Sequence, residues 1–136
     1  MIHLLHLLLI VILLLSLGLS SKMSRVSIKQ EYHGVCDDGV ESNYNNHIIT
    51  SSESLNTIIN DLNLVKQSIS WNINFVTEFM VLSTSHGSNI RGNCIDKGGN
   101  HLDFITFTTR DYRPNLSYKF FVIDKNNFTT CNDIEL

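Results

Sequence analysis

The hydrophobic positions of this chain form one unbroken run near the N-terminus and shorter periodic groups after it. Residues 7–15 are all Leu, Ile or Val, and further leucines flank them. Such a run has the length of the apolar region of a secretory signal peptide, and Gly18 and Ser20 place small side chains at −3 and −1 of a cut before Ser21. The sequence therefore predicts a signal peptide over residues 1–20, followed by a single secreted domain over residues 21–136.

The charges around the run favour a second interpretation. Only His3 and His6 precede it, whereas the first cations, Lys22 and Arg25, follow it. This bias favours the orientation that leaves the C-terminus in the cytosol, and residues 4–19 approach the shortest helix that spans a bilayer. An uncleaved membrane anchor over residues 4–19 is thus the alternative, and we expect membrane contact only if the segment is retained.

The pattern then changes to short periodic groups. Period-two apolar positions in residues 26–35 (Val26, Ile28, Gln30 and Tyr32 on one face) predict a half-buried strand. Turn residues fill 36–46, and residues 48–49 form a short extended piece. Thr50 and Glu53 have capping-box spacing, which predicts a helix start. An apolar stripe continues that helix to about residue 63, through Leu55, Ile58, Ile59 and Leu62.

Strand patterns dominate the remaining residues. Residues 71–76 alternate, and the continuous apolar run 79–82 predicts a strand covered on both faces. A polar loop is expected over residues 83–92. Three further strands are expected after it, at 93–97, 102–109 and 116–123. A hairpin turn at 98–100 joins the first two, and a turn over 110–115 joins the last two. The fold class predicted is α+β: a mainly antiparallel sheet or small sandwich with one packed amphipathic helix.

Composition narrows the classes of function. The net charge is −3, and no cluster of Lys and Arg supplies the basic face of a nucleic-acid-binding protein. The chain after residue 20 is rich in Asn, Ser and Thr and has one proline, which suits an extracellular protein. We therefore expect an extracellular protein partner, no nucleic acid and no cofactor.

The cysteines and glycosylation motifs add two expectations that depend on the compartment. Cys36, Cys94 and Cys131 are odd in number, so an oxidising compartment predicts one intramolecular bridge with a leftover thiol, or an intermolecular bond. All three pairings stay open, and three buried free thiols are the alternative. Asn115 and Asn127 begin N-glycosylation motifs and are candidate acceptors in a secreted protein.

No group of residues has the pattern of a catalytic or metal site. Hydroxyl residues lie beside His86 in residues 83–87, but no nucleophile elbow is present. His33 and Cys36 with the following aspartates lack the two further ligands that zinc needs, so we predict a turn there. We assign no catalytic, cofactor-binding or metal-binding residue, and a hydrolase that uses His86 is the enzyme alternative.

Two stretches resemble a known family. Residues 48–55 (IITSSESL) and 71–82 (WNINFVTEFMVL), with the closing strand 120–123 (FFVI), look like the PrcB C-terminal-domain pattern over about residues 48–125. Asn74-Phe75 stands where the family usually has Asp-Phe, and residues 88–93 depart from its glycine-rich loop. The resemblance implies a β-rich secreted module that associates with other proteins and has no catalytic residues. A fainter similarity, through residues 98–99 and 113–114, is to chagasin-like protease inhibitors.

These observations favour a non-enzymatic domain that binds a protein partner through its loops. Loops on a rigid sheet commonly carry binding residues. The loop over 83–92 and the turn over 110–115 supply the expected partner contacts Ser85, His86, Arg91 and Arg113. A membrane-tethered structural protein and a chagasin-like inhibitor are two further interpretations of the same sequence.

Overall fold

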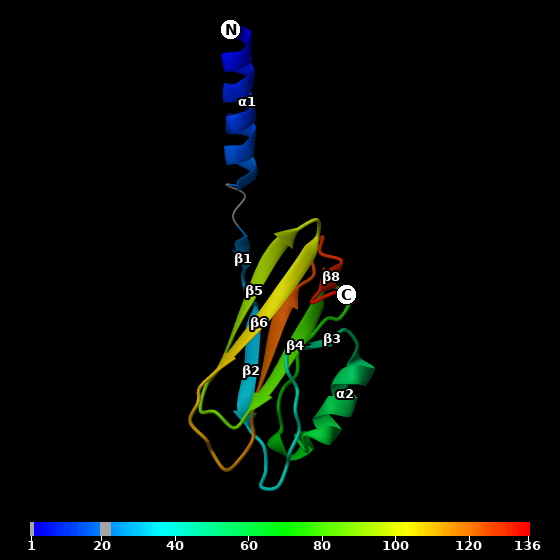
Figure 1. The fold of residues 1–136 in the computed structure, drawn as a ribbon. Coiled ribbons are helices and arrows are strands. Elements are labelled where there is room, and N and C mark those ends of the chain that lie inside the picture. The colour runs from blue at the N-terminus through cyan, green and yellow to red at the C-terminus, as the bar shows by residue number, and fades with distance from the viewer. Residues whose placement is uncertain (1, 20–22) are drawn as a thin grey trace.

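The computed structural model describes residues 2–19 and 23–136, and the side chains of residues 2–10 and 23–136. In these residues the chain forms two α-helices, α1 (Ile2–Leu19) and α2 (Ser52–Asp61), a 3-10 helix η1 (Val65–Gln67) and two sheets (Figure 1). The protein is β-rich with mostly antiparallel pairing, in agreement with the predicted α+β class.

The two sheets are built from segments that alternate along the chain. The outer sheet has the order β1 (Ser24–Val26), β5 (Ile90–Gly98), β6 (His101–Thr108), β8 (Thr130–Cys131), β9 (Ile134–Glu135). The central sheet has the order β2 (Gln30–Val35), β7 (Ser117–Asp124), β4 (Glu78–Ser85), β3 (His47–Ile49). Only β6 and β8 pair in parallel within the described chain. The sequence pattern does not predict the short strands β8 and β9, which follow the last expected strand.

The middle strands of the central sheet, β4 and β7, are buried on both faces, which gives the described chain three layers. One face packs on the outer sheet through a core that includes Phe79, Phe104 and Phe121. The other face packs on α2 and residues 64–75 through a second core that includes Leu82 and Phe120. This two-sided burial confirms the interpretation of residues 79–82, because a strand between two layers is apolar at every position.

Helix α2 begins one residue later than the capping box predicts. The N-cap is Ser51, whose backbone is extended and whose hydroxyl accepts the Ser54 N–H at 3.2 Å. The predicted caps Thr50 and Glu53 do not serve this role. The stripe through Leu55, Ile58 and Leu62 is buried against the central sheet, as its spacing predicts.

Residues 71–76 keep the predicted alternation but form no strand. Trp71, Ile73 and Phe75 turn toward the central sheet, and the residues between them are exposed. The Trp71 ring centroid lies 4.8 Å from that of Tyr32 and 4.9 Å from that of Phe120. The segment therefore covers the sheet as an extended strap, because its side chains rather than its backbone make the contact.

The strand expected over residues 26–35 is two strands in different sheets. Val26 and Ile28 pack between the sheets, whereas Tyr32 packs on the α2 side. The chain changes sheet at residues 27–29, where the Lys29 N–H donates to Val122 O at 2.8 Å. A period-two pattern is the same on both sides of such a crossover. The prediction that residues 26–32 present one face of a single strand is therefore wrong.

The polar loop expected over residues 83–92 is shorter than predicted. Strand β4 continues to Ser85 and β5 begins at Ile90. The hairpin at residues 98–100 is confirmed: Gly99 and Asn100 both have positive φ, as a two-residue hairpin turn requires.

Helix α1 occupies most of the predicted signal segment and lies apart from the sheets (Figure 1). The leucines in its described part, residues 2–10, are exposed, with Leu4 at 75% and Leu8 at 62%. Among the described residues, no helix is long and apolar enough to span a bilayer. The predicted cleavage position, between Ser20 and Ser21, lies outside the described residues.

Candidate functional site

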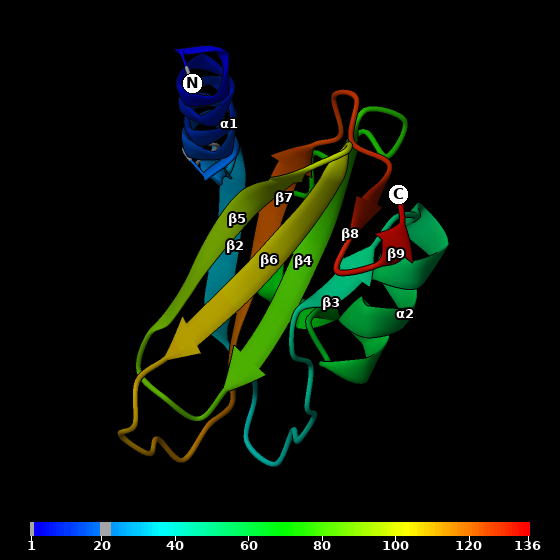
Figure 2. The ribbon, with the colours of Figure 1, turned by 45° about the horizontal axis from the view of Figure 1, so that its top comes forward.

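Three loops meet at one end of the sandwich and bring predicted contact residues together. They are the β2–β3 loop (36–46), the β4–β5 loop (86–89) and the β6–β7 loop (109–116), and Figure 2 shows them side by side below the strands. We call this surface the loop end. It contains Ser85, His86 and Arg113, so three of the four predicted partner contacts lie near one another.

His86 joins all three loops. Its Nδ1 lies 2.8 Å from Arg113 O, and its Nε2 lies 2.9 Å from Glu41 Oε2. Its ring stacks on Tyr112, with centroids 4.8 Å apart and an interplanar angle of 19°. Both nitrogens face acceptors, so each favours a proton, and the carboxylate of Glu41 followed by the Arg113 carbonyl raises the pKa of His86 above 6.5.

Among the described residues, the hydrogen bonds of His86 direct neither ring nitrogen at a serine hydroxyl. A general base needs a free ring nitrogen within reach of a nucleophile hydroxyl, and here both nitrogens are engaged. Ser83 is buried and bonds to Asn46 N and the Thr106 hydroxyl. Ser85 Oγ accepts the Gly87 N–H at 2.9 Å. In the described part of the chain these hydrogen bonds connect the loops to one another and to the sheets, and a hydrolase that uses His86 stays an untested alternative.

The β6–β7 loop is held in place by hydrogen bonds from its neighbours. Asp111 Oδ1 accepts the Ser88 N–H at 3.1 Å, and Arg113 N–H donates to His86 O at 2.7 Å. Hydrogen bonds from Ser88 and Thr109 hold the pKa of Asp111 well below its usual value. Tyr112 is 77% exposed above this framework. The loop end is thus an ordered surface that presents an aromatic ring to solvent.

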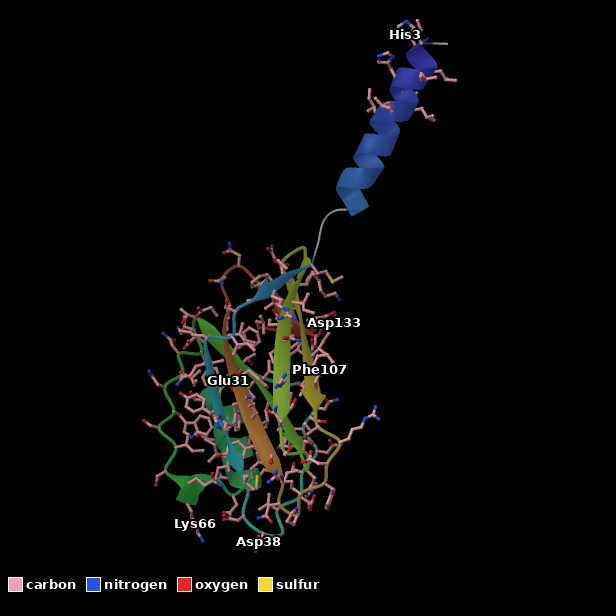
Figure 3. All side chains as sticks on the ribbon, turned by 90° about the vertical axis from the view of Figure 1, so that its left-hand side faces the viewer. His3, Glu31, Asp38, Lys66, Phe107 and Asp133 are labelled. Atoms are coloured by element: carbon pink, nitrogen blue, oxygen red, sulfur yellow. The ribbon has the colours of Figure 1, made fainter. Side chains whose placement is uncertain are left out.

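Arg91, the fourth predicted contact, lies on a different feature. It lines a cavity of about 480 Å³ along the side of the sandwich, where the edge strand β2 lies beyond the edge of β5. We call this cavity the side groove; its lining is Arg25, Glu31, Arg91, Gly92, Asn93, Phe107 and Lys119. Figure 3 looks onto this side, with Glu31 and Phe107 labelled.

The side groove is positively charged within a chain whose net charge is −3. Three cations and one carboxylate line it. Lys119 neutralises that carboxylate: its Nζ lies 3.2 Å from Glu31 Oε2 and 2.9 Å from Ile90 O. In the described part of the chain, Arg25 and Arg91 form no salt bridge. Their charges are therefore available to a ligand.

The groove continues toward the loop end. A second cavity of about 150 Å³, lined by residues 33–35, 88–90 and 117–119, shares Lys119 with it. A third, of about 230 Å³, shares Arg91 and Phe107 and reaches Thr109. Phe107 is 57% exposed beside Arg91. The two smaller cavities thus extend the side groove as far as residues 88–89 and Thr109 of the loop end.

The expected intramolecular disulfide is absent, and the topology explains why. All three cysteines are buried free thiols. Cys36 packs on the α2 side of the central sheet, whereas Cys94 and Cys131 lie between the sheets. The last two flank β6, opposite Phe104 and Leu102. Two strand spacings of about 4.8 Å separate them, more than the ~7 Å that a disulfide spans.

Burial also makes these thiols unreactive. Desolvation raises the pKa of Cys36 and of Cys94 to about 11, and that of Cys131 to about 12. The thiolate is the reactive form, so the cysteines do not constitute a chemical site. No group of three metal-binding side chains occurs within residues 2–19 and 23–136.

The two glycosylation motifs differ in their surroundings. The amide nitrogen of Asn115 donates to Cys36 O at 3.2 Å and to Asp38 Oδ1 at 2.7 Å. Asn127 is exposed in the turn after β7. A glycan on Asn115 would replace one of those hydrogens, whereas one on Asn127 would extend into solvent.

Comparison with protein-family models, curated proteins and solved structures found no match to this chain. The similarity to PrcB C-terminal domains and the fainter one to chagasin-like inhibitors stay predictions.

Sequence analysis missed most of the side groove. Arg25 and Glu31 lie on consecutive strands that belong to different sheets, and they meet Lys119 of the distant strand β7 only when the sheets stack. The sequence offers a small signal for Lys119, a charged residue between two aromatic residues of its strand, but none for Glu31, which follows the polar Gln30. Phe107 gave no signal, because an aromatic residue in a strand is expected in the core.

Proposed function

We propose that this chain is secreted and that its β-rich part binds a protein partner without catalysis, through the surface formed by the side groove and the adjacent Tyr112. One observation carries the proposal: the side groove is lined by Arg25 and Arg91, which form no salt bridge in the described chain, and by the exposed ring of Phe107. Arginine and aromatic side chains are enriched among the residues that contribute most to protein interfaces.

Rigidity supports this proposal over a catalytic role. Hydrogen bonds from His86 and Asp111 fix the loops before a partner arrives. An ordered surface loses less conformational entropy on association than a mobile one. The same hydrogen bonds occupy the ring nitrogens that a hydrolase based on His86 needs.

The test compares variants of the secreted protein as bait in its native extracellular fluid. Arg91→Glu and Phe107→Ala alter the side groove, whereas Lys66→Glu and Val65→Ala alter exposed residues of η1 on another face. We expect each groove variant to capture the wild-type partner at least tenfold less, which is about 1.4 kcal/mol, and the η1 variants to capture it normally. Equal capture by all variants would refute the assignment of this surface.

A further inference from the structure

The side groove runs along an uncovered edge of the outer sheet. Strand β1 pairs with β5 only at Cys94–Asp96, although β5 and β6 pair from Ile90 onward. After Val26 the chain leaves for the central sheet instead of continuing beside β5. In the described chain, no strand therefore covers residues 90–93 on the groove side.

The hydrogen-bond pattern shows which backbone groups face this edge. Thr109 N–H donates to Asn89 O at 3.1 Å, so Asn89 faces β6. Backbone direction alternates along an antiparallel strand, which turns residues 91 and 93 toward β6 and residues 90 and 92 toward the groove. The bond from Lys119 Nζ to Ile90 O agrees with this assignment. The N–H and C=O of Gly92 therefore point into the groove.

We propose, on the basis of the proposed function, that the partner binds by adding an extended acidic segment to this edge of β5. An added strand would donate to Gly92 C=O and accept from Gly92 N–H, as in β-strand addition to other sheet edges. It would extend the outer sheet over the part of β2 that carries Glu31 and His33, which is exposed in the structure. Pairing with residues 90–93 spans about 10 Å, or three to four residues.

The positive charges beside this edge favour an acidic partner segment. Arg91 lies on the outer face of β5, opposite Phe107, and Arg25 lies on the same face of β1, opposite Ile95. Carboxylates at alternate positions of an added strand would lie on this face, within reach of both guanidinium groups, and opposite charges on neighbouring strands stabilise a sheet. A second copy of this chain would place arginines against arginines. The charges therefore favour an acidic partner segment over self-association.

The test uses blocked eight-residue peptides and the protein as it is secreted from cells that express the full chain. One peptide alternates Glu and Thr, a second alternates Lys and Thr, and a third is the Glu-Thr peptide N-methylated at alternate residues. We expect only the first to bind, with at least tenfold loss on N-methylation and slower hydrogen exchange of the Gly92 amide on binding. Arg25→Glu with Arg91→Glu should reverse the preference to the Lys-Thr peptide, and Lys66→Glu should leave it unchanged.

Each other result overturns the inference in a recognisable way. Equal binding of the N-methylated peptide would show charge attraction without strand pairing. Binding of a sulfated oligosaccharide with no binding of any peptide would assign the arginines to a polysaccharide. If the peptides fail but capture of the partner still depends on Arg91, the strand addition is wrong and the proposed function stands. If the peptides bind but partner capture does not depend on Arg91, the proposed function fails instead.

Discussion

The side chain of His86 contacts two neighbouring loops from its position at the end of β4. In the sequence it lies among hydroxyl residues and invites a catalytic interpretation. In the structure its two nitrogens face Glu41 and the Arg113 carbonyl, and its ring supports Tyr112. Both ring nitrogens face acceptors, so the imidazole links the loops and the raised pKa favours its protonated form.

We therefore predict that the order of the loop end depends on pH. The Glu41 carboxylate raises the pKa of His86 above its unfolded value near 6.5. A raised pKa means that the stabilisation is complete below about pH 6.5 and is lost as the pH rises through the folded-state pKa. Histidine side-chain NMR should show His86 titrating above 6.5, with Tyr112 resonances shifting at the same pH.

The matched variants separate this effect from a general response to pH. Glu41→Gln removes the carboxylate, so the pKa of His86 should fall toward its ordinary value. Lys66→Gln, on η1, should leave it unchanged. A His86 that titrates identically in the wild type and in Glu41→Gln would show that the Glu41 contact does not form in solution.

A second prediction concerns the two glycosylation motifs. Asn115 needs both hydrogens of its amide nitrogen to bond to Cys36 O and Asp38, whereas Asn127 is exposed. We expect the folded, secreted protein to carry one glycan, on Asn127. Glycopeptide mass spectrometry should show loss of the glycan in Asn127→Gln and an unchanged glycan in Asn115→Gln. A glycan on Asn115 in folded protein would contradict these two hydrogen bonds.

At the scale of elements, the close contact between the two sheets depends on a glycine at position 92. Gly92 lies on β5 facing inward, and a Cβ there would overlap the rings of Phe104 and Phe121. Both rings are buried in the core between the sheets. A larger residue would push β5 away from β7 and widen the side groove from within.

We predict that Gly92→Ala lowers the free energy of unfolding by about 1–3 kcal/mol, the usual cost of overpacking a core. Urea denaturation of the secreted protein measures the change. Asn93→Ala, whose side chain lies on the opposite face of the same strand, should change it by no more than about 0.5 kcal/mol. An unchanged stability in Gly92→Ala would mean that the sheets are not as close as the structure has them.

The elements that sequence analysis predicted correctly are those with a local cause. The stripe of Leu55, Ile58 and Leu62 defines α2, and the apolar run 79–82 identifies β4, because one face or both faces of each are buried. The crossover at residues 27–29 and the strap at 71–76 follow instead from which layer each segment meets. A period-two pattern is the same for a paired strand and for an unpaired extended segment, so the sequence does not distinguish them.

The candidate site shows the same division. Ser85, His86 and Arg113 were predicted from loops, and loops at one end of a sandwich converge whatever the strand order. The side groove depends on β2 lying beyond the edge of β5, which requires the strand order of both sheets. Arg25 and Lys119 acquire their roles only from that order.

At the scale of the whole molecule, the described chain combines three packed layers with one apolar helix, α1, that lies apart from them in Figure 1. Leu4, Leu5 and Leu8 of α1 are each more than half exposed. Apolar area left in water costs roughly 25 cal/mol per Å², so an isolated helix of this composition requires an apolar environment or removal. This cost supports the proposal that residues 1–20 act as a signal peptide.

The corresponding prediction is that the exported protein begins at Ser21. Leu9→Arg places a charge in the centre of the apolar run, at a cost of about 3 kcal/mol for insertion into a bilayer, and should reduce export at least tenfold. Val65→Arg, at an exposed apolar position of η1, should not. N-terminal sequencing and the amount of protein in the medium measure both effects. Protein recovered from the medium with Met1 attached would show that the helix is retained, and export of Leu9→Arg at the wild-type level would show that another feature directs the chain out of the cell.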